Sequence, residues 1–168
     1  MKNIVMIIAP VNFRDEELME PKQVLENSGA KVTIASRGTA LAKGSRGASV
    51  KVDMSISQVN AANYDAVIFV GGSGATVYLN DATAHSIAKQ TLAQGKILGA
   101  ICMAPSILAN AGLLKGKKAT AFPSEVSNLT SKGAIVEDKN VVQDGNIITG
   151  KGPQAAREFG EKIRDSLK

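Results

Sequence analysis

Short apolar runs alternate with amphipathic stretches along the whole chain. Ile4–Ala9, the AVIFV segment within Tyr64–Gly72, and Lys96–Ile101 are apolar at nearly every position. Continuous runs of this kind are typical of strands that a parallel sheet buries on both faces. Lys31–Ser36 predicts a further short strand.

Helical patterns lie between these strands. The stretch from Arg14 to Gly29 begins with acidic residues, spaces its apolar residues as a helix does, and ends at a glycine. Pro21 lies inside it and should bend the helix or locally break its hydrogen-bond ladder. Further helices are predicted at Asp81–Gln94, at Pro105–Ala111, near Glu125–Ser131, and from Pro153 to the end of the sequence.

The remaining patterns are short strands. They are a hairpin within Gly38–Val52, a strand at Lys117–Phe122, and two or three strands within Ala134–Gly150 with a turn at Asp144–Gly145. The alternation predicts a doubly wound, three-layer α/β sandwich with a mostly parallel central sheet, of the flavodoxin-like type. The 168 residues contain no repeat or linker, so we expect a single domain over residues 1–168.

Composition narrows the possible partners and the compartment. The sequence is 44% hydrophobic and 21% charged, with a net charge of +5. Lys115, Lys117 and Lys118 form the densest basic group, but without interleaved aromatic residues a solvated loop is favoured over a nucleic-acid surface. A single cysteine indicates a reducing compartment. The first apolar run is too short to span a membrane and lacks a signal peptidase site, so we expect a cytoplasmic protein.

The one cysteine follows the third apolar run, where that run gives way to the helix predicted from Pro105. A nucleophile elbow needs small residues two positions before and after the nucleophile, and Ala100 and Ala104 stand there. The elbow would place the Cys102 thiol at a helix N-terminus, where the dipole and free amides favour a thiolate. A lone cysteine in an apolar run is also commonly an inert core side chain, so both interpretations stay open here.

A glycine-rich stretch, GGSG, follows the second apolar run. It matches neither the phosphate loop G-x-x-x-x-G-K-[ST] nor a full G-x-G-x-x-G fingerprint, so no nucleotide cofactor is predicted. A tight turn that needs positive φ explains the glycines structurally. The N–H groups of Gly72 and Ser73, with that of Met103 beside the cysteine, are also candidate donors to an oxyanion next to the thiol.

The acidic start of the first predicted helix offers a proton carrier. Acids at such positions commonly only complement the helix dipole. Glu17, however, lies about one turn before Pro21 and is expected to point inward across the strand ends. An ionised carboxylate would disfavour a neighbouring thiolate, whereas a Glu17 kept protonated by burial would donate a hydrogen bond to sulfur and stabilise the thiolate.

The single histidine, His85, lies mid-helix among polar neighbours and is expected at the surface. No group of His, Cys and carboxylate residues has the spacing of metal ligands. We therefore predict neither a metal nor a cofactor.

Four stretches resemble the ThiJ/PfpI superfamily, whose members share the class I glutamine amidotransferase-like fold, and together they span nearly the whole chain. The resemblance implies that Glu17 is the family's glutamate four residues before a proline and that Cys102 is its reactive cysteine. It also implies a homodimer. Val70 replaces the family's usual proline before the glycines. The stretches are VNFRDEELMEP, VIFVGGSGA, GAICMAPSILANAGLLKGKKAT and DGNIITGKGP.

Two histidines of the family are missing from this chain. Met103 stands directly after the cysteine, and Phe122 stands before a proline, at positions where different branches of the family have histidine. A Cys–His dyad, and with it a PfpI-type cysteine peptidase, is therefore disfavoured unless another subunit supplies a base.

The resemblance implies instead a cysteine-dependent stress-response protein. Glyoxalase- or deglycase-like chemistry on small reactive carbonyls, or on their adducts, would use Cys102 as nucleophile and Glu17 as proton carrier. The alternative is a non-enzymatic redox sensor or chaperone that responds to an oxidant through oxidation of Cys102.

Overall fold

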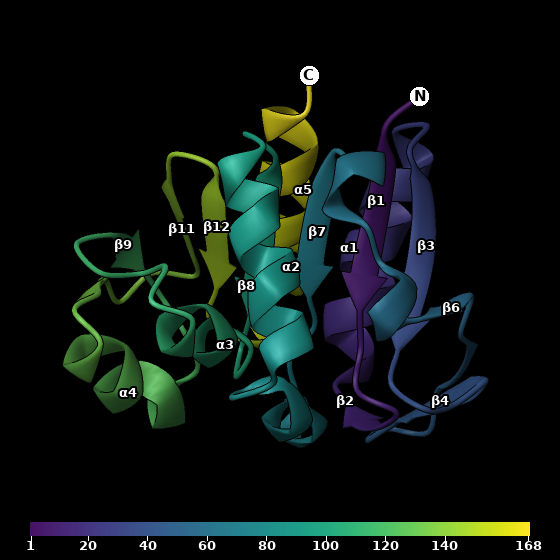
Figure 1. The fold of residues 1–168 in the computed structure, drawn as a ribbon, viewed down its shortest axis with the longest axis horizontal. Helices are drawn as coiled ribbons and strands as arrows, with labels where there is room; N and C mark the ends of the chain where they lie inside the picture. The colour runs from purple at the N-terminus through teal and green to yellow at the C-terminus, as the bar shows by residue number, and fades with distance from the viewer.

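Seven strands form the central sheet in the order β11-β12-β8-β7-β1-β3-β6, as the computed structural model of residues 1–168 shows (Figure 1). Neighbouring strands are parallel except β11, which runs antiparallel to β12. The predicted mostly parallel sheet is therefore confirmed. The strands are β1 (Asn3–Ile7), β3 (Lys31–Ser36), β6 (Met54–Ser55), β7 (Ala66–Phe69), β8 (Ile97–Ile101), β11 (Val141–Asp144) and β12 (Ile147–Gly150).

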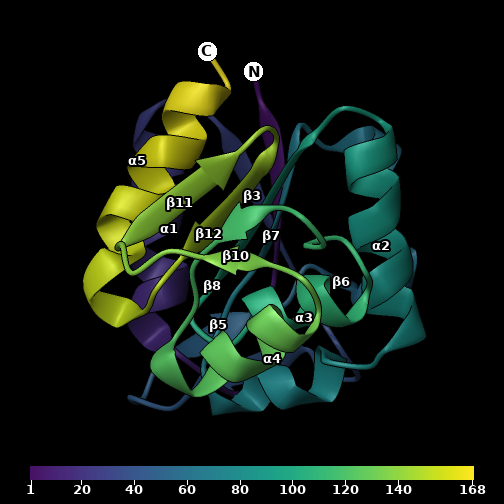
Figure 2. The same cartoon turned by 90° about the vertical axis from the view of Figure 1, so that its left-hand side faces the viewer.

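Helices cover both faces of this sheet, which gives the three layers seen edge-on in Figure 2. One face carries α1 (Asp15–Asn27) and α5 (Ala156–Ser166), which pack against each other. The other face carries α2 (Ala82–Ala93), α3 (Pro105–Asn110) and α4 (Val126–Ser131).

Two apolar cores explain why the strand sequences are apolar throughout. Along β1, Ile4 and Met6 pack into the core under α1 and α5, while Val5 and Ile7 pack into the core under α2 and α3. Successive strand residues point to opposite faces, so a strand with a helix layer on each side has no solvated position.

Shorter elements complete the chain. A small sheet joins β2 (Val11–Phe13), β4 (Leu41–Gly44) and β5 (Ser49–Lys51), in which β4 and β5 form the predicted hairpin. A second joins β9 (Lys118–Ala119) and β10 (Ile135–Val136). Five 3₁₀ turns lie between these elements: η1 (Ile56–Gln58), η2 (Ala61–Asn63), η3 (Ser73–Tyr78), η4 (Pro123–Glu125) and η5 (Pro153–Ala155).

The structure corrects one prediction about local structure. The strand expected at Lys117–Phe122 is paired only over β9, outside the central sheet, because the Thr120 amide donates to the Thr149 hydroxyl and the Phe122 amide to the Cys102 carbonyl. The helix α1 is continuous from Asp15 to Asn27, and the effect of Pro21 on its hydrogen-bond ladder is limited to the one bond that its missing N–H leaves out. The proline ring is buried against α5, and this packing compensates for the one backbone donor that proline lacks.

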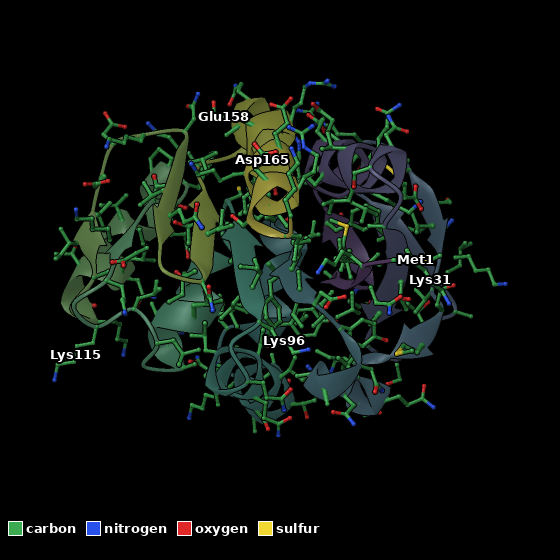
Figure 3. The ribbon with its side chains drawn as sticks, turned by 90° about the horizontal axis from the view of Figure 1, so that it is seen from above. Met1, Lys31, Lys96, Lys115, Glu158 and Asp165 are labelled. Carbon is green, nitrogen blue, oxygen red and sulfur yellow. The ribbon has the colours of Figure 1, made fainter.

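The basic loop lies at the periphery. Lys115, Lys117 and Lys118 are all exposed, and seen from above Lys115 stands at the outer edge, far from Glu158 and Asp165 on α5 (Figure 3). None of the helices combines the length and apolar character that crossing a bilayer requires.

Candidate functional site

The carboxyl ends of β8, β7 and β1 lie side by side, at the lower edge of the sheet in Figure 1. The chain leaves β1 toward β3 on one side, while β7 pairs with its other side. In doubly wound sheets, a crevice opens at the strand ends where neighbouring strands connect to opposite sides in this way. The three segments singled out in the sequence therefore converge: the loop after β1 with the start of α1, the glycines after β7, and Cys102 after β8.

Cys102 adopts the backbone of an elbow. Its φ is +65°, a left-handed conformation that costs a non-glycine residue about 1–2 kcal/mol. Its N–H donates to the Gly150 carbonyl and its own carbonyl accepts from the Phe122 amide, each at 2.9 Å. Ala100 and Ala104 are both fully buried, which agrees with the need for small residues there. Sequence alone left an elbow and a core residue open, and Cys102 has features of both, because its side chain is only 6% exposed and packs in the core under α1 and α5.

The two glycines after β7 allow the three loops to approach closely. A Cβ atom at position 71 would lie 2.5 Å from Glu17 Oε1 and 2.6 Å from the Cys102 Cβ. Gly72 has a φ of +100°, and a Cβ there would lie 2.5 Å from the Arg14 nitrogen. Any side chain at either position would therefore separate the carboxyl from the thiol or the β1 loop from the β7 loop.

Glu17 points inward, as its spacing from Pro21 predicts. The residue is completely buried, and neither carboxyl oxygen has a hydrogen-bond partner of good geometry. Burial raises the pKa of Glu17 to about 7, and the nearby Cys102 thiol and the Arg14 guanidinium act in the opposite direction. Near neutral pH this acid is therefore balanced between its two protonation states.

The thiol is held in its neutral form. Burial raises the pKa of Cys102 to about 12, and the charge of an ionised Glu17 adds to this effect. The backbone amides of Gly72 and Met103 lie close enough to lower the pKa, but burial outweighs them. The amides of the elbow are expected to favour a thiolate, but burial in the core under α1 and α5 instead favours the neutral thiol.

Arg14 is a residue of this site that sequence reasoning missed. Its backbone amide donates to the Gly71 carbonyl at 3.0 Å. Its guanidinium binds Glu16 through Nε and Nη2, at 3.0 and 2.8 Å, which leaves the Nη1 hydrogens free. In the sequence, Arg14 stands directly before the acidic first turn of the helix. That position alone is typical of an ordinary helix start and does not indicate a functional residue.

The other predicted residues lie as follows. Ser73 is exposed, and its carbonyl accepts a hydrogen bond from Thr76 Oγ1. The role of its amide as an oxyanion donor stays a prediction. Met103 is half-buried. His85, expected at the surface, is half-buried there, and its Nε2 lies 2.8 Å from the Leu79 carbonyl. It stands on α2, whose buried residues belong to the core opposite Cys102.

Comparisons with known proteins agree with this fold. A model of the DJ-1/PfpI family matches residues 2–166. A deglycase of Pyrococcus horikoshii is 36% identical over 150 residues, which cover 89% of this chain and 90% of that protein. A ThiJ/PfpI domain protein from Brachyspira murdochii has a crystal structure with a TM-score of 0.96 at 33% identity, covering 98% of this chain and 95% of that one. DJ-1beta of Drosophila melanogaster reaches a TM-score of 0.89 at 33% identity, over 99% of this chain and 91% of that one.

Proposed function

The chain belongs to the DJ-1/PfpI family, and from this we propose that it is a deglycase-like stress-response enzyme that acts on small reactive carbonyl compounds or their adducts. One observation carries the proposal: the fully buried, unpartnered Glu17 carboxyl lies next to the Cys102 thiol across Gly71. A relative named as a deglycase supports the choice of substrate class.

The proposed first step is the addition of the thiol to an aldehyde carbon. The sulfur forms a bond to carbon, the carbonyl π electrons move to oxygen, and the thiol proton passes through Glu17 to that oxygen. The product is a hemithioacetal, with no atom or electron lost. A carboxylate on Glu17 takes the proton while the S–C bond forms, so a thiol with a raised pKa can still react without a preformed thiolate.

Backbone amides complete the proposed site. The Gly72 and Met103 amides lie close enough to lower the pKa of the thiol, and with the Ser73 amide they are the donors proposed to stabilise the oxyanion as the carbonyl opens. The proposed site differs from a Cys–His dyad because the side chain after the cysteine is a thioether and the only histidine is on the opposite face of the sheet. These features argue against a cysteine peptidase.

Consumption of methylglyoxal tests the proposal. We expect Cys102→Ala to lose the protein-dependent rate and Glu17→Gln to lose about 100-fold or more, the usual contribution of a positioned acid–base group. The wild-type rate should rise with pH through about 7, because the carboxylate form of Glu17 is the base. Ser127→Ala, an exposed change on α4, is the matched control. Equal rates in the wild type and Cys102→Ala would contradict the proposal.

A redox sensor is the second candidate, favoured by the two unpartnered oxygens of Glu17. The thiol would take one oxygen from each of two peroxide molecules and release two waters, and a protonated Glu17 would then donate a hydrogen bond to the resulting sulfinate. Because the pKa of Cys102 is raised, little thiolate is present at neutral pH to react with peroxide. We therefore favour the enzymatic function over the redox sensor.

Intact-mass measurement after graded peroxide separates the two candidates. A sensor should gain two oxygen atoms at Cys102 in the wild type and stop before this state in Glu17→Leu. If the thiol stays unmodified by peroxide while the protein consumes methylglyoxal, the redox sensor is rejected and the enzymatic function is retained.

A further inference from the structure

A polar cluster joins α3 to α4 behind the elbow. The Ser106 hydroxyl, completely buried on α3, donates to Glu125 Oε1 at 2.7 Å. The Ser124 hydroxyl donates to Glu125 Oε2 at 2.9 Å. Asn128 Nδ2 donates both to Ser106 Oγ at 3.1 Å and to Asn110 Oδ1 at 3.0 Å. Glu125 has no cationic partner, so its charge is met by hydroxyl groups alone.

This cluster forms a closed ring with Cys102. The Cys102 carbonyl accepts from the Phe122 amide at 2.9 Å, and the Phe122 carbonyl accepts from the Glu125 amide at 2.8 Å. The Glu125 carboxylate then returns to Ser106, four residues after the cysteine. The carbonyl of the strained elbow is thus bonded to Phe122, the residue before η4, and Ser106 connects the elbow to Glu125, the last residue of η4.

The cluster also reaches the segment that follows the glycines. Asn110 Nδ2 donates to the Leu79 carbonyl and to Asn80 Oδ1, each at 3.0 Å. Leu79 follows directly after η3, and η3 begins one residue after Gly72. Asn110 of α3, held by Asn128 of α4, therefore connects the helix that follows the cysteine with the segment that follows η3.

We propose that Glu125 and Asn128 are positioning residues, which hold Cys102 and the Gly72 amide in the relative placement that the reaction needs. The inference rests on the proposed function, because the reaction gives these residues their role. The placement of Cys102 relative to the Gly72 amide is measurable without a substrate. Neither residue touches the sulfur, and both act through Ser106 and Asn110 on α3.

Two physical reasons make such support necessary. A helix of six residues such as α3 has too few hydrogen bonds to hold its own position, so tertiary contacts decide where it lies. The left-handed φ of Cys102 would relax if the segment after it could move. Hydrogen bonds to an ionised acceptor are about twice as strong as neutral ones, which suits Glu125 to this role.

The test is the rate at which iodoacetamide alkylates the lone thiol, measured across pH in the full-length protein. Removal of the support in Glu125→Ala or Asn128→Ala should raise the alkylation rate at a given pH several-fold, because the enclosed sulfur becomes more accessible when the segment after it can move. The pH midpoint should also fall, because burial is the main cause of the raised pKa of the thiol and a displaced sulfur is less buried.

Two variants control for folding. Glu125→Gln keeps an acceptor for the Ser106 hydroxyl and should restore the wild-type midpoint. Thr91→Ala removes a buried hydroxyl bond of α2, away from the cluster, and should reduce stability without moving the midpoint. If Glu125→Ala and Asn128→Ala keep the midpoint of Thr91→Ala, the inference is wrong. If the midpoints move but no variant or wild type consumes methylglyoxal, the positioning stands and the proposed function fails.

Discussion

At the scale of single residues, the site depends on an acid that the fold keeps away from water. A buried carboxyl without hydrogen-bond partners destabilises a folded protein, and the cost is larger when it is ionised. Glu17 shows this arrangement at 0% exposure, next to a thiol whose pKa is raised by the same burial. Groups whose environments separate their pKa values in this way are suited to exchange a proton.

The burial of Glu17 predicts how stability changes with pH. Its pKa is about 7 in the folded chain against an ordinary value of 4.5, so the folded protein retains a proton that the unfolded chain releases between these values. This contribution to the free energy of unfolding is fully present below pH 4.5 and is lost as the pH rises through 7, a loss on the order of 3 kcal/mol.

Urea unfolding across this pH range checks the prediction. Glu17→Gln should show a flatter pH dependence than the wild type and should gain stability relative to it from acid to mildly alkaline conditions. Parallel curves for the two proteins would mean that Glu17 titrates normally.

At the scale of elements, α1 and α5 approach each other at one close contact. A Cβ at Gly160 would lie 2.7 Å from the Pro21 Cα and 3.2 Å from its Cβ. This contact gives Pro21 a packing role, and it fixes the N-terminal half of α1, which presents Glu17 to the sheet.

Gly160→Ala tests the contact. In an unconstrained helix this change stabilises by about 1 kcal/mol, whereas here we expect a loss of about 1–3 kcal/mol, because backbone atoms of Pro21 must move. Thermal unfolding of the variant beside Lys162→Ala, an exposed change two residues later, measures the difference. A more stable Gly160→Ala would show that the helices separate at no cost.

Local patterns in the sequence predicted the elements better than they predicted the chemistry of the site. The apolar runs identified β1, β7 and β8, and the position of Glu17 one turn before Pro21 predicted its inward side chain. The state of the thiol was not predictable in this way, because it depends on burial in a core that residues far along the chain, such as Ile148 and Phe159, help to form. The same holds for Arg14, whose contact with the glycine loop needs the neighbouring order of β7 and β1.

At the scale of the whole molecule, two helix layers and one sheet place all proposed chemistry at one edge. The opposite edge carries the two termini, which Figure 1 shows close together. The homodimer stays a prediction. Exposed apolar side chains on β2, α1 and β4 are available to it: Val11, Met19 and Leu41.

The near-complete enclosure of the sulfur has a practical consequence. The chain has one cysteine, and 6% of that residue is open to solvent. A bulky maleimide–polymer tag therefore has no room to attach while the molecule is folded, and attaches once to every chain that has opened. The protein thus carries its own gel-shift reporter of unfolding, readable in a crude lysate without an engineered label.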